Sequence, residues 1–130
     1  MSLSNYTENK FLDMLVGKTD FTMPTVYIGL STANPGESAS GLAEPVAMGY
    51  ARVATTGATW AAAASGSISN AAEIAFAVSS GTWGTITYVA LFDALTTGNM
   101  LAYGVLTQAK AIISGDTPKF AIGSLVITAD

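Results

Sequence analysis

The sequence predicts a mainly β domain: a compact antiparallel β-sandwich or barrel of about 7–8 strands with one short N-terminal helix. Apolar residues alternate with polar or small ones in most segments beyond residue 20, which is the period of a strand. Clusters of Gly, Pro, Ser, Asn and Asp separate these segments at intervals of about 8–12 residues. Apolar residues at helical spacing stand out in one segment, near the start. We expect residues 1–130 to form a single domain.

The first 20 residues predict a helix of about three turns. Ser4 or Asn5 can cap its N-terminus, because a small oxygen-bearing side chain accepts hydrogen bonds from the free N–H groups of the first turn. Gly17 then fits the C-terminal cap. Between them the apolar residues recur at helical spacing, at Phe11, Leu12, Leu15 and Val16. We expect the helix to dock by this face, and segment 1–20 is the candidate docking helix or arm.

The first strand and a long loop follow the helix. Thr25–Ser31 alternates strictly and places Val26, Ile28 and Leu30 on one face. Residues 33–48 are rich in Gly, Pro, Ser and Glu, which predicts a long exposed loop. Further strand pieces are expected at Tyr50–Thr56 and Thr59–Trp60.

The second half of the chain contains the strongest strand signals. Ile74, Phe76 and Val78 alternate with alanines, as in a half-buried strand. Trp83–Asp93 is apolar on both faces and therefore predicts a central strand. Alternation places Ile86, Tyr88 and Phe92 on one face of it and Val89 and Leu91 on the other.

A hairpin turn and the closing strands complete the predicted sheet. Thr96–Asn99 is a hairpin turn signal that leads into a strand at Met100–Gln108. Lys110–Ser114 continues as strand, and Gly115–Pro118 turns the chain. Phe120–Thr128 is the last expected strand.

The chain has unusually few charges. Only 14 of its 130 residues are charged (5 Lys or Arg and 9 Asp or Glu), whereas an ordinary globular domain has about 25%. A monomer has too little charge to cover its surface, so the composition indicates a protein made for assembly. The net charge is −4 and the basic residues are scattered, which argues against nucleic-acid binding.

Two long uncharged stretches, Val53–Ala72 and Ile74–Phe92, are long enough to span a bilayer. Ser, Thr and Gly interrupt both, so we expect sheet and loop there and no membrane association. The polar start of the sequence does not resemble a signal peptide.

Residues for catalysis or metal binding are scarce. The chain has neither His nor Cys, which excludes Ser–His and Cys–His nucleophiles and thiolate metal sites. Asp93 and Asp116 are better explained as turn-formers than as a catalytic pair. Glu37 and Glu44 lie in one loop but form no calcium motif. The sequence predicts no catalytic residues, no cofactor and no metal.

The aromatic residues leave three alternatives open. Most fall in β segments, where core packing is the default, but Trp and Tyr also anchor subunit interfaces, and a sugar-binding platform has the same appearance in sequence. The candidate interface residues are Tyr6, Phe11, Leu12, Leu15, Trp60 and Trp83.

An ordered set of short segments covers nearly the whole chain and carries a family resemblance. The segments are Leu3–Lys10 (LSNYTENK), Pro24–Thr32 (PTVYIGLST), Tyr50–Arg52 (YAR), Trp83–Thr87 (WGTIT), Phe92–Asp93 (FD), Gly98–Gly104 (GNMLAYG) and Ser114–Phe120 (SGDTPKF). Together they resemble small tailed-phage and prophage virion proteins that are often labelled tail fibre or minor tail proteins. The resemblance implies a structural role in the virion and no catalytic motif.

Three functions follow from this resemblance and the composition. A compact β domain without repeats or heptads suggests a capsid decoration (cement) protein that stabilises the head. A minor tail or tail-fibre-associated protein is the alternative, and a carbohydrate-binding module or lytic enzyme is a third. The expected partners are copies of the chain itself, with a trimer favoured by analogy, and either the phage major capsid protein or tail proteins.

Overall fold

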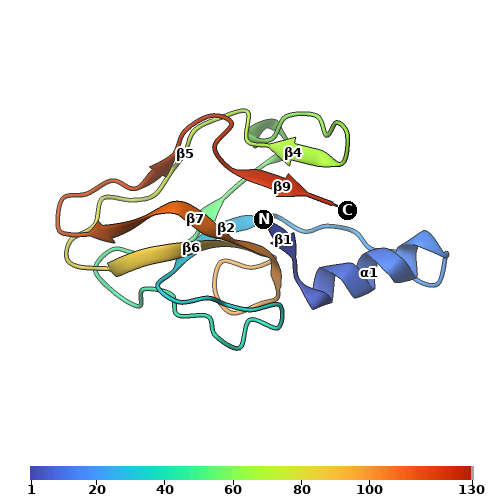
Figure 1. The fold of residues 1–130 in the computed structure, drawn as a ribbon, viewed down its shortest axis with the longest axis horizontal. Helices are drawn as coiled ribbons and strands as arrows, with labels where there is room; N and C mark the ends of the chain where they lie inside the picture. The colour runs from blue at the N-terminus through green and yellow to red at the C-terminus, as the bar shows by residue number, and fades with distance from the viewer. Residues whose placement is uncertain (130) are drawn as a thin grey trace.

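The largest element of the protein is a five-stranded antiparallel sheet, in a computed structural model that describes residues 1–129. The strand order is β1–β7–β6–β2–β3 (Figure 1). These strands are β1 (Ser2–Leu3), β2 (Tyr27–Ser31), β3 (Val53–Ala54), β6 (Gly84–Phe92) and β7 (Met100–Ile112). As predicted, β6 is the middle strand and forms a hairpin with β7 across the turn at 96–99.

Two small sheets lie on one side of the large one, above β6 and β7 in Figure 1. They pair β4 (Ser67–Ser69) with β9 (Val126–Thr128), and β5 (Ile74–Ala75) with β8 (Lys119–Phe120). One helix, α1 (Asn5–Leu15), and a 3-10 turn, η1 (Gly57–Thr59), complete the elements of residues 1–129. The prediction of a mainly β fold with antiparallel strands and one short N-terminal helix is confirmed.

The main core lies between the large sheet and the small ones. The large sheet contributes Ile28, Leu30, Val89, Leu91, Leu101 and Ile112, and the opposite side contributes Ile74, Phe76 and Leu125. Each such side chain stabilises the fold by about 1.5–3 kcal/mol when it is fully buried. The large sheet and the small sheets are held together because both bury apolar side chains in this shared core.

Ile86 lies on a different face from the predicted one. Strict alternation along β6 places Ile86 opposite to Val89, but both pack in the main core. The register of β6 against β7 shifts just beyond Ile86, which pairs with Lys110, whereas Tyr88 pairs with Val105. A bulge of this kind interrupts the alternation and changes the face that the following side chains occupy.

The predicted last strand, Phe120–Thr128, is divided into β8 and β9 by a buried asparagine. The Asn70 side-chain N–H donates to the Ala121 carbonyl at 2.9 Å, and its carbonyl oxygen accepts from the Leu125 N–H at 2.9 Å. Gly123 has a positive φ of 78° and donates its N–H to the backbone carbonyl of Asn70 at 2.8 Å. These bonds fix a turn where the apolar pattern alone predicted continuous strand.

Other predicted strand boundaries also differ: β2 begins at Tyr27 rather than Thr25, and only Val53–Ala54 of the predicted piece Tyr50–Thr56 is strand. The strand expected through Val78 ends at Ala75, although Phe76 is buried and its N–H donates to the Pro118 carbonyl at 2.8 Å. Thr59 belongs to η1 rather than to a strand. The long strand β7 ends at Ile112, two residues before the predicted end. The Phe76 bond is a tertiary effect, whereas η1 is formed by local hydrogen bonds between Thr56 and Thr59 and the N–H of Ile113, just beyond β7, is bonded locally to Asp116.

The loop 33–48 packs on the other face of the large sheet, below β6 in Figure 1. Ala90, Phe92 and Met100 form a second buried cluster there, and Ala39 and Leu42 of the loop pack against it. Much of the loop surface is exposed, but Pro35 is fully buried. The loop therefore covers part of the sheet rather than standing away from the domain.

Candidate interaction surfaces

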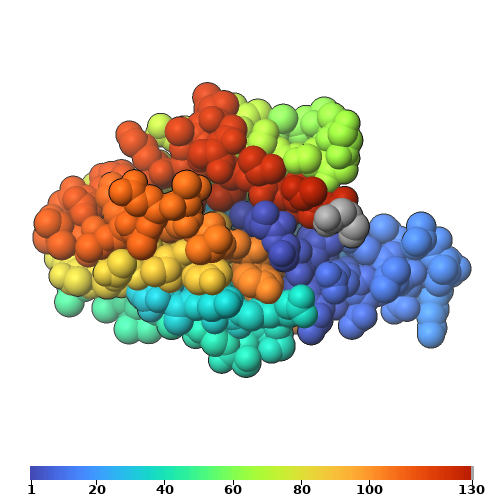
Figure 2. Space-filling model, viewed as in Figure 1, coloured from blue at the N-terminus to red at the C-terminus, as the bar shows by residue number. Residues whose placement is uncertain are grey.

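Residues 1–20, the arm, are anchored to the domain at their first residues only. β1 pairs with Ala102 and Tyr103 of β7, and the Ser4 N–H donates to the Leu101 carbonyl at 3.0 Å. Ser4 is the N-cap of α1, as its residue type predicted: its hydroxyl oxygen accepts from the Thr7 N–H at 3.3 Å. Thr7 is the buried residue of α1. Beyond it the arm projects from one end of the molecule (Figure 2).

One face of α1 is apolar and exposed. Glu8, Phe11, Leu12 and Leu15 are spaced i, i+3, i+4 and i+7, so they form one stripe along the helix, which we call the arm stripe. Leu12 is 60% and Leu15 78% exposed, whereas Phe11, which contacts Phe21, is 36% exposed. The helix was expected to dock by this face, yet its own domain does not bury it. An exposed apolar stripe of this kind typically marks a protein contact.

Tyr6 lies beside the stripe and belongs to a small aromatic group. Its ring is 6.4 Å from that of Phe21, edge to face, and the Phe21 ring is 5.9 Å from that of Phe11. Lys10 extends over the Tyr6 ring at 5.7 Å. These contacts hold Phe21, which follows the arm, against the helix, and they bring Tyr6 and Phe11 together around the Phe21 ring.

Trp60 and Trp83 lie away from the arm and point inward. Trp83 is 4% exposed in the main core, and its indole N–H donates to the Met48 carbonyl at 2.8 Å. Trp60 is half-buried against that core and donates to the Thr55 hydroxyl at 3.2 Å. Four of the six candidate interface residues thus lie on the arm and two lie in the β domain; Tyr6, at the start of the arm, also packs against the main core, as both tryptophans do.

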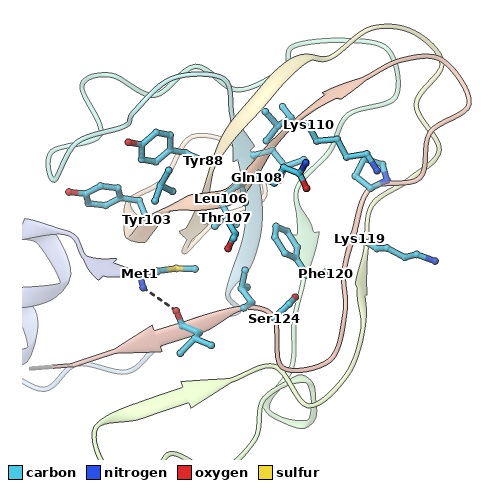
Figure 3. Close-up of a pocket in the computed structure, with 18 of the residues that line it drawn as sticks. Met1, Tyr88, Tyr103, Leu106, Thr107, Gln108, Lys110, Lys119, Phe120 and Ser124 are labelled. Carbon is cyan, nitrogen blue, oxygen red and sulfur yellow. Dashed lines mark hydrogen bonds between the residues drawn. The ribbon is translucent and has the colours of Figure 1, made fainter.

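A groove of about 800 Å³ runs between β7 and the segment 118–126 (Figure 3). Apolar side chains line much of it, among them Ile86, Val105, Leu106, Phe120 and Leu125. Met1 lies at one end, where its amino group donates to the Val126 carbonyl at 3.1 Å. No local sequence pattern predicts this groove, because its walls come from segments that only the fold brings together.

The groove is bordered by an open strand edge and by positive charge. β1 covers only the Ala102 and Tyr103 positions of β7, and no other strand of residues 1–129 pairs with that edge. Lys110 and Lys119 line the groove at the end away from Met1 (Figure 3), and its lining within the described chain contains no Asp or Glu. In a protein of net charge −4 this is a locally basic, apolar concavity.

The only arginine of the chain organises a buried polar network that sequence reasoning missed. Arg52 makes a bidentate ion pair with Glu44, with N–O distances of 2.6 and 2.9 Å. It also donates to the carbonyls of Ala94 and Thr97, both at 2.8 Å. The guanidinium carbon lies 3.4 Å from the Phe92 ring centre. Glu44, which appeared to be a surface acid, therefore ties the loop 33–48 to the β6–β7 turn.

Tyr50 completes this network. Its hydroxyl donates to Glu44 at 2.7 Å and accepts from the Leu30 N–H at 2.9 Å. Burial raises the pKa of the Tyr50 hydroxyl well above its ordinary value of about 10, and the hydrogen bond to Glu44 raises it further. The group is neutral and structural, with no feature of an activated nucleophile.

The raised pKa of Tyr50 predicts a loss of stability in alkali. The unfolded chain releases the tyrosine proton near pH 10 and the folded chain retains it, so the contribution of Tyr50 is complete below about pH 9 and declines as the pH rises above about 10. Urea unfolding at pH 8 and pH 10.5 measures it, with Tyr50→Phe as the reference. The stability difference between wild type and variant should shrink at the higher pH, and a constant difference would contradict the prediction.

Two further acids, Asp93 and Asp116, bond to turns of the backbone. The carboxylate of Asp93 accepts from the backbone N–H of Asn99 at 2.6 Å and from its side chain at 2.8 Å, and Asp116 accepts from the Ile113 N–H at 3.0 Å. Both acids are turn-formers, as predicted. No group of three or more His, Cys, Asp or Glu in the described part of the chain is arranged to hold a metal ion.

Within residues 1–129, no helix has the length and apolar character that crossing a membrane requires.

A small antiparallel β domain with a projecting apolar arm is a subunit of the kind that contacts other proteins. The chain belongs to a phage fibre family, because residues 2–128 match the family model described as Podophage GP4 fiber I protein gp80. No curated protein matches the chain significantly. The predicted resemblance to phage virion and tail-fibre proteins is thereby confirmed. The protein is a virion component, assembled in the host, and associates with other components of the phage particle.

Proposed function

We propose that the chain is a non-enzymatic structural subunit of the phage particle, held there as a homo-oligomer, with a trimer favoured, through contacts that include the arm. The observation that carries this proposal is the exposed arm stripe, with Leu12 60% and Leu15 78% exposed on a well-formed helix. A free monomer gains nothing from exposing these side chains, whereas a partner that buries them gains about 1.5–3 kcal/mol for each.

The absence of an enzymatic role is supported by the chemistry of the polar residues. The chain has neither His nor Cys, and its buried polar network is a satisfied ion pair that joins loop and turn. A glycan platform built on both tryptophans has little support, because Trp83 is only 4% exposed. The domain acts as one unit over residues 1–130, arm included, and the family match over residues 2–128 supports this.

A position on a tail fibre or its attachment site is favoured by the family description, which names a fiber I protein. A capsid decoration protein is the second candidate. It is favoured by the compact two-layered β fold and by the low charge, 14 charged residues in 130, which suits a subunit largely covered by neighbours.

The number of copies per particle separates these two positions. For a fibre or tail subunit we expect a few to a few dozen copies, counted by quantitative mass spectrometry against the major capsid protein and seen only on the tail by electron microscopy. A decoration protein is present in hundreds of copies, and particles that lack it break more easily on heating. Purified particles without the protein would contradict the whole proposal.

A further inference from the structure

We propose that the arm stripe of one copy docks in the groove between β7 and residues 118–126 of a second copy. The inference deepens the proposed function and rests on it, since it names the contact by which the subunits hold one another. Its two halves are separate on the molecule: the arm projects from one end, and the groove borders the free edge of β7 (Figures 1 and 3).

The stripe has the pattern of a helix that binds in a groove. Helices recognised in this way present anchors at i, i+3, i+4 and i+7, and the arm presents Glu8, Phe11, Leu12 and Leu15 at that spacing. The groove, at about 800 Å³, is within the range of about 300–1,000 Å³ typical of pockets that bury a drug-sized ligand.

Charge complementarity identifies the occupant. The stripe carries one charged residue, Glu8, among its apolar anchors, and the groove is lined by Lys110 and Lys119 without a carboxylate in the described chain. A partner for this groove should therefore be apolar with a negative charge. The arm of a second copy satisfies both conditions.

A copy cannot insert its own arm. α1 starts immediately after β1, which is paired to β7, and the buried Ser4 and Thr7 fix the start of the helix against the domain. The stripe lies on the same side of the helix as Ser4 and Thr7, since Phe11 is four residues after Thr7, but its side chains are exposed because the helix extends beyond the end of the domain (Figure 2). Because donor and acceptor are different patches, the contact generates a reciprocal dimer, a closed ring such as a trimer, or an open filament where the rotation between copies does not close.

Disulfide trapping tests the contact directly, because the chain has no native Cys. Leu15→Cys and Val105→Cys are prepared in purified chains of different length, mixed and mildly oxidised. Val105 lines the groove and is 69% exposed. We expect a mixed-size disulfide at least about tenfold more abundant than with the matched control Leu15→Cys plus Val46→Cys, because docking raises the effective concentration of the pair. Val46 is 98% exposed and lies outside the groove lining.

Charge exchange gives a second measurement. Lys119→Glu should weaken self-association about threefold to fivefold in sedimentation experiments, and adding Glu8→Lys should restore it. Equal trapping with Val105 and Val46, or a chain that stays monomeric at about 100 μM, overturns the proposal. So does a Val105–Val105 disulfide without the mixed one, which instead indicates pairing between β7 edges. Normal incorporation into particles in any of these cases leaves the role as a virion subunit intact and refutes only the contact between arm and groove. Trapping of a protein that is missing from particles refutes the proposed function but not this contact.

Discussion

Replacing Arg52 by Met is expected to lower the free energy of unfolding by about 3–5 kcal/mol, because a buried carboxylate is left without its counter-ion. The Arg52 side chain is 4% exposed and that of Glu44 19%. The substitution also leaves the carbonyls of Ala94 and Thr97 without the guanidinium donor. Loss of the pair should release the loop 33–48 first, so hydrogen exchange at the Ala43 N–H should rise along with the fall in stability measured by urea unfolding.

Two further variants make this prediction specific. Glu44→Gln should cost less than Arg52→Met, because a neutral amide can still accept from Tyr50. The double variant should cost less than the sum, as expected for groups in one network. Lys18→Met is the matched control, since it removes an exposed positive charge and should change stability by less than about 0.5 kcal/mol. A small effect of Arg52→Met, similar to that of Lys18→Met, would refute the structural role of the network.

The parts of the fold that depend on local chemistry could be predicted from sequence. Ser4 is the helix cap because its hydroxyl meets an N–H three residues away, and the Thr96–Asn99 turn joins neighbouring strands. Alternation along β2 likewise placed Ile28 and Leu30 in the core. Each of these features involves residues close in the chain.

Features that depend on distant partners could not be predicted. Arg52 meets the carbonyls of Ala94 and Thr97 across 42 and 45 residues, and no pattern around Arg52 indicates them. The Asn70 bonds that divide the last strand cross 51 and 55 residues. No sequence pattern indicates the groove either, since the segments that form its walls are distant in the chain and meet only in the folded domain.

For the arm stripe, the sequence predicted the position of the apolar face but not what that face contacts. Helical spacing located the arm stripe, but periodicity does not say whether an apolar face meets its own domain or another protein. The domain buries this side of the helix only at Ser4 and Thr7, and the stripe is exposed because the helix continues beyond the end of the domain (Figure 2). For Trp83 the residue type alone fitted the core, an interface or a sugar-binding site, and the fold places it in the main core.

The second large effect is expected at the arm stripe, where stability and assembly should separate. Leu12→Gln plus Leu15→Gln should change the free energy of unfolding of the dilute protein by less than about 0.5 kcal/mol per site, because both side chains are already exposed. The same change should lower the number of copies in purified particles sharply. Each leucine buried by a partner is worth about 1.5–3 kcal/mol, so losing two weakens the contact at least about a hundredfold.

Val46→Gln is the matched control for this experiment. It also replaces an apolar side chain that is 98% exposed, but on the loop 33–48 and not on the arm, and it should leave the copy number unchanged. Deleting residues 1–10 should have the same direction of effect as the double substitution, although it also removes β1 and the buried Ser4 and Thr7 and so costs stability. The double substitution is therefore the decisive variant: full occupancy of particles by a stable Leu12→Gln, Leu15→Gln protein would show that the exposed stripe has no part in assembly.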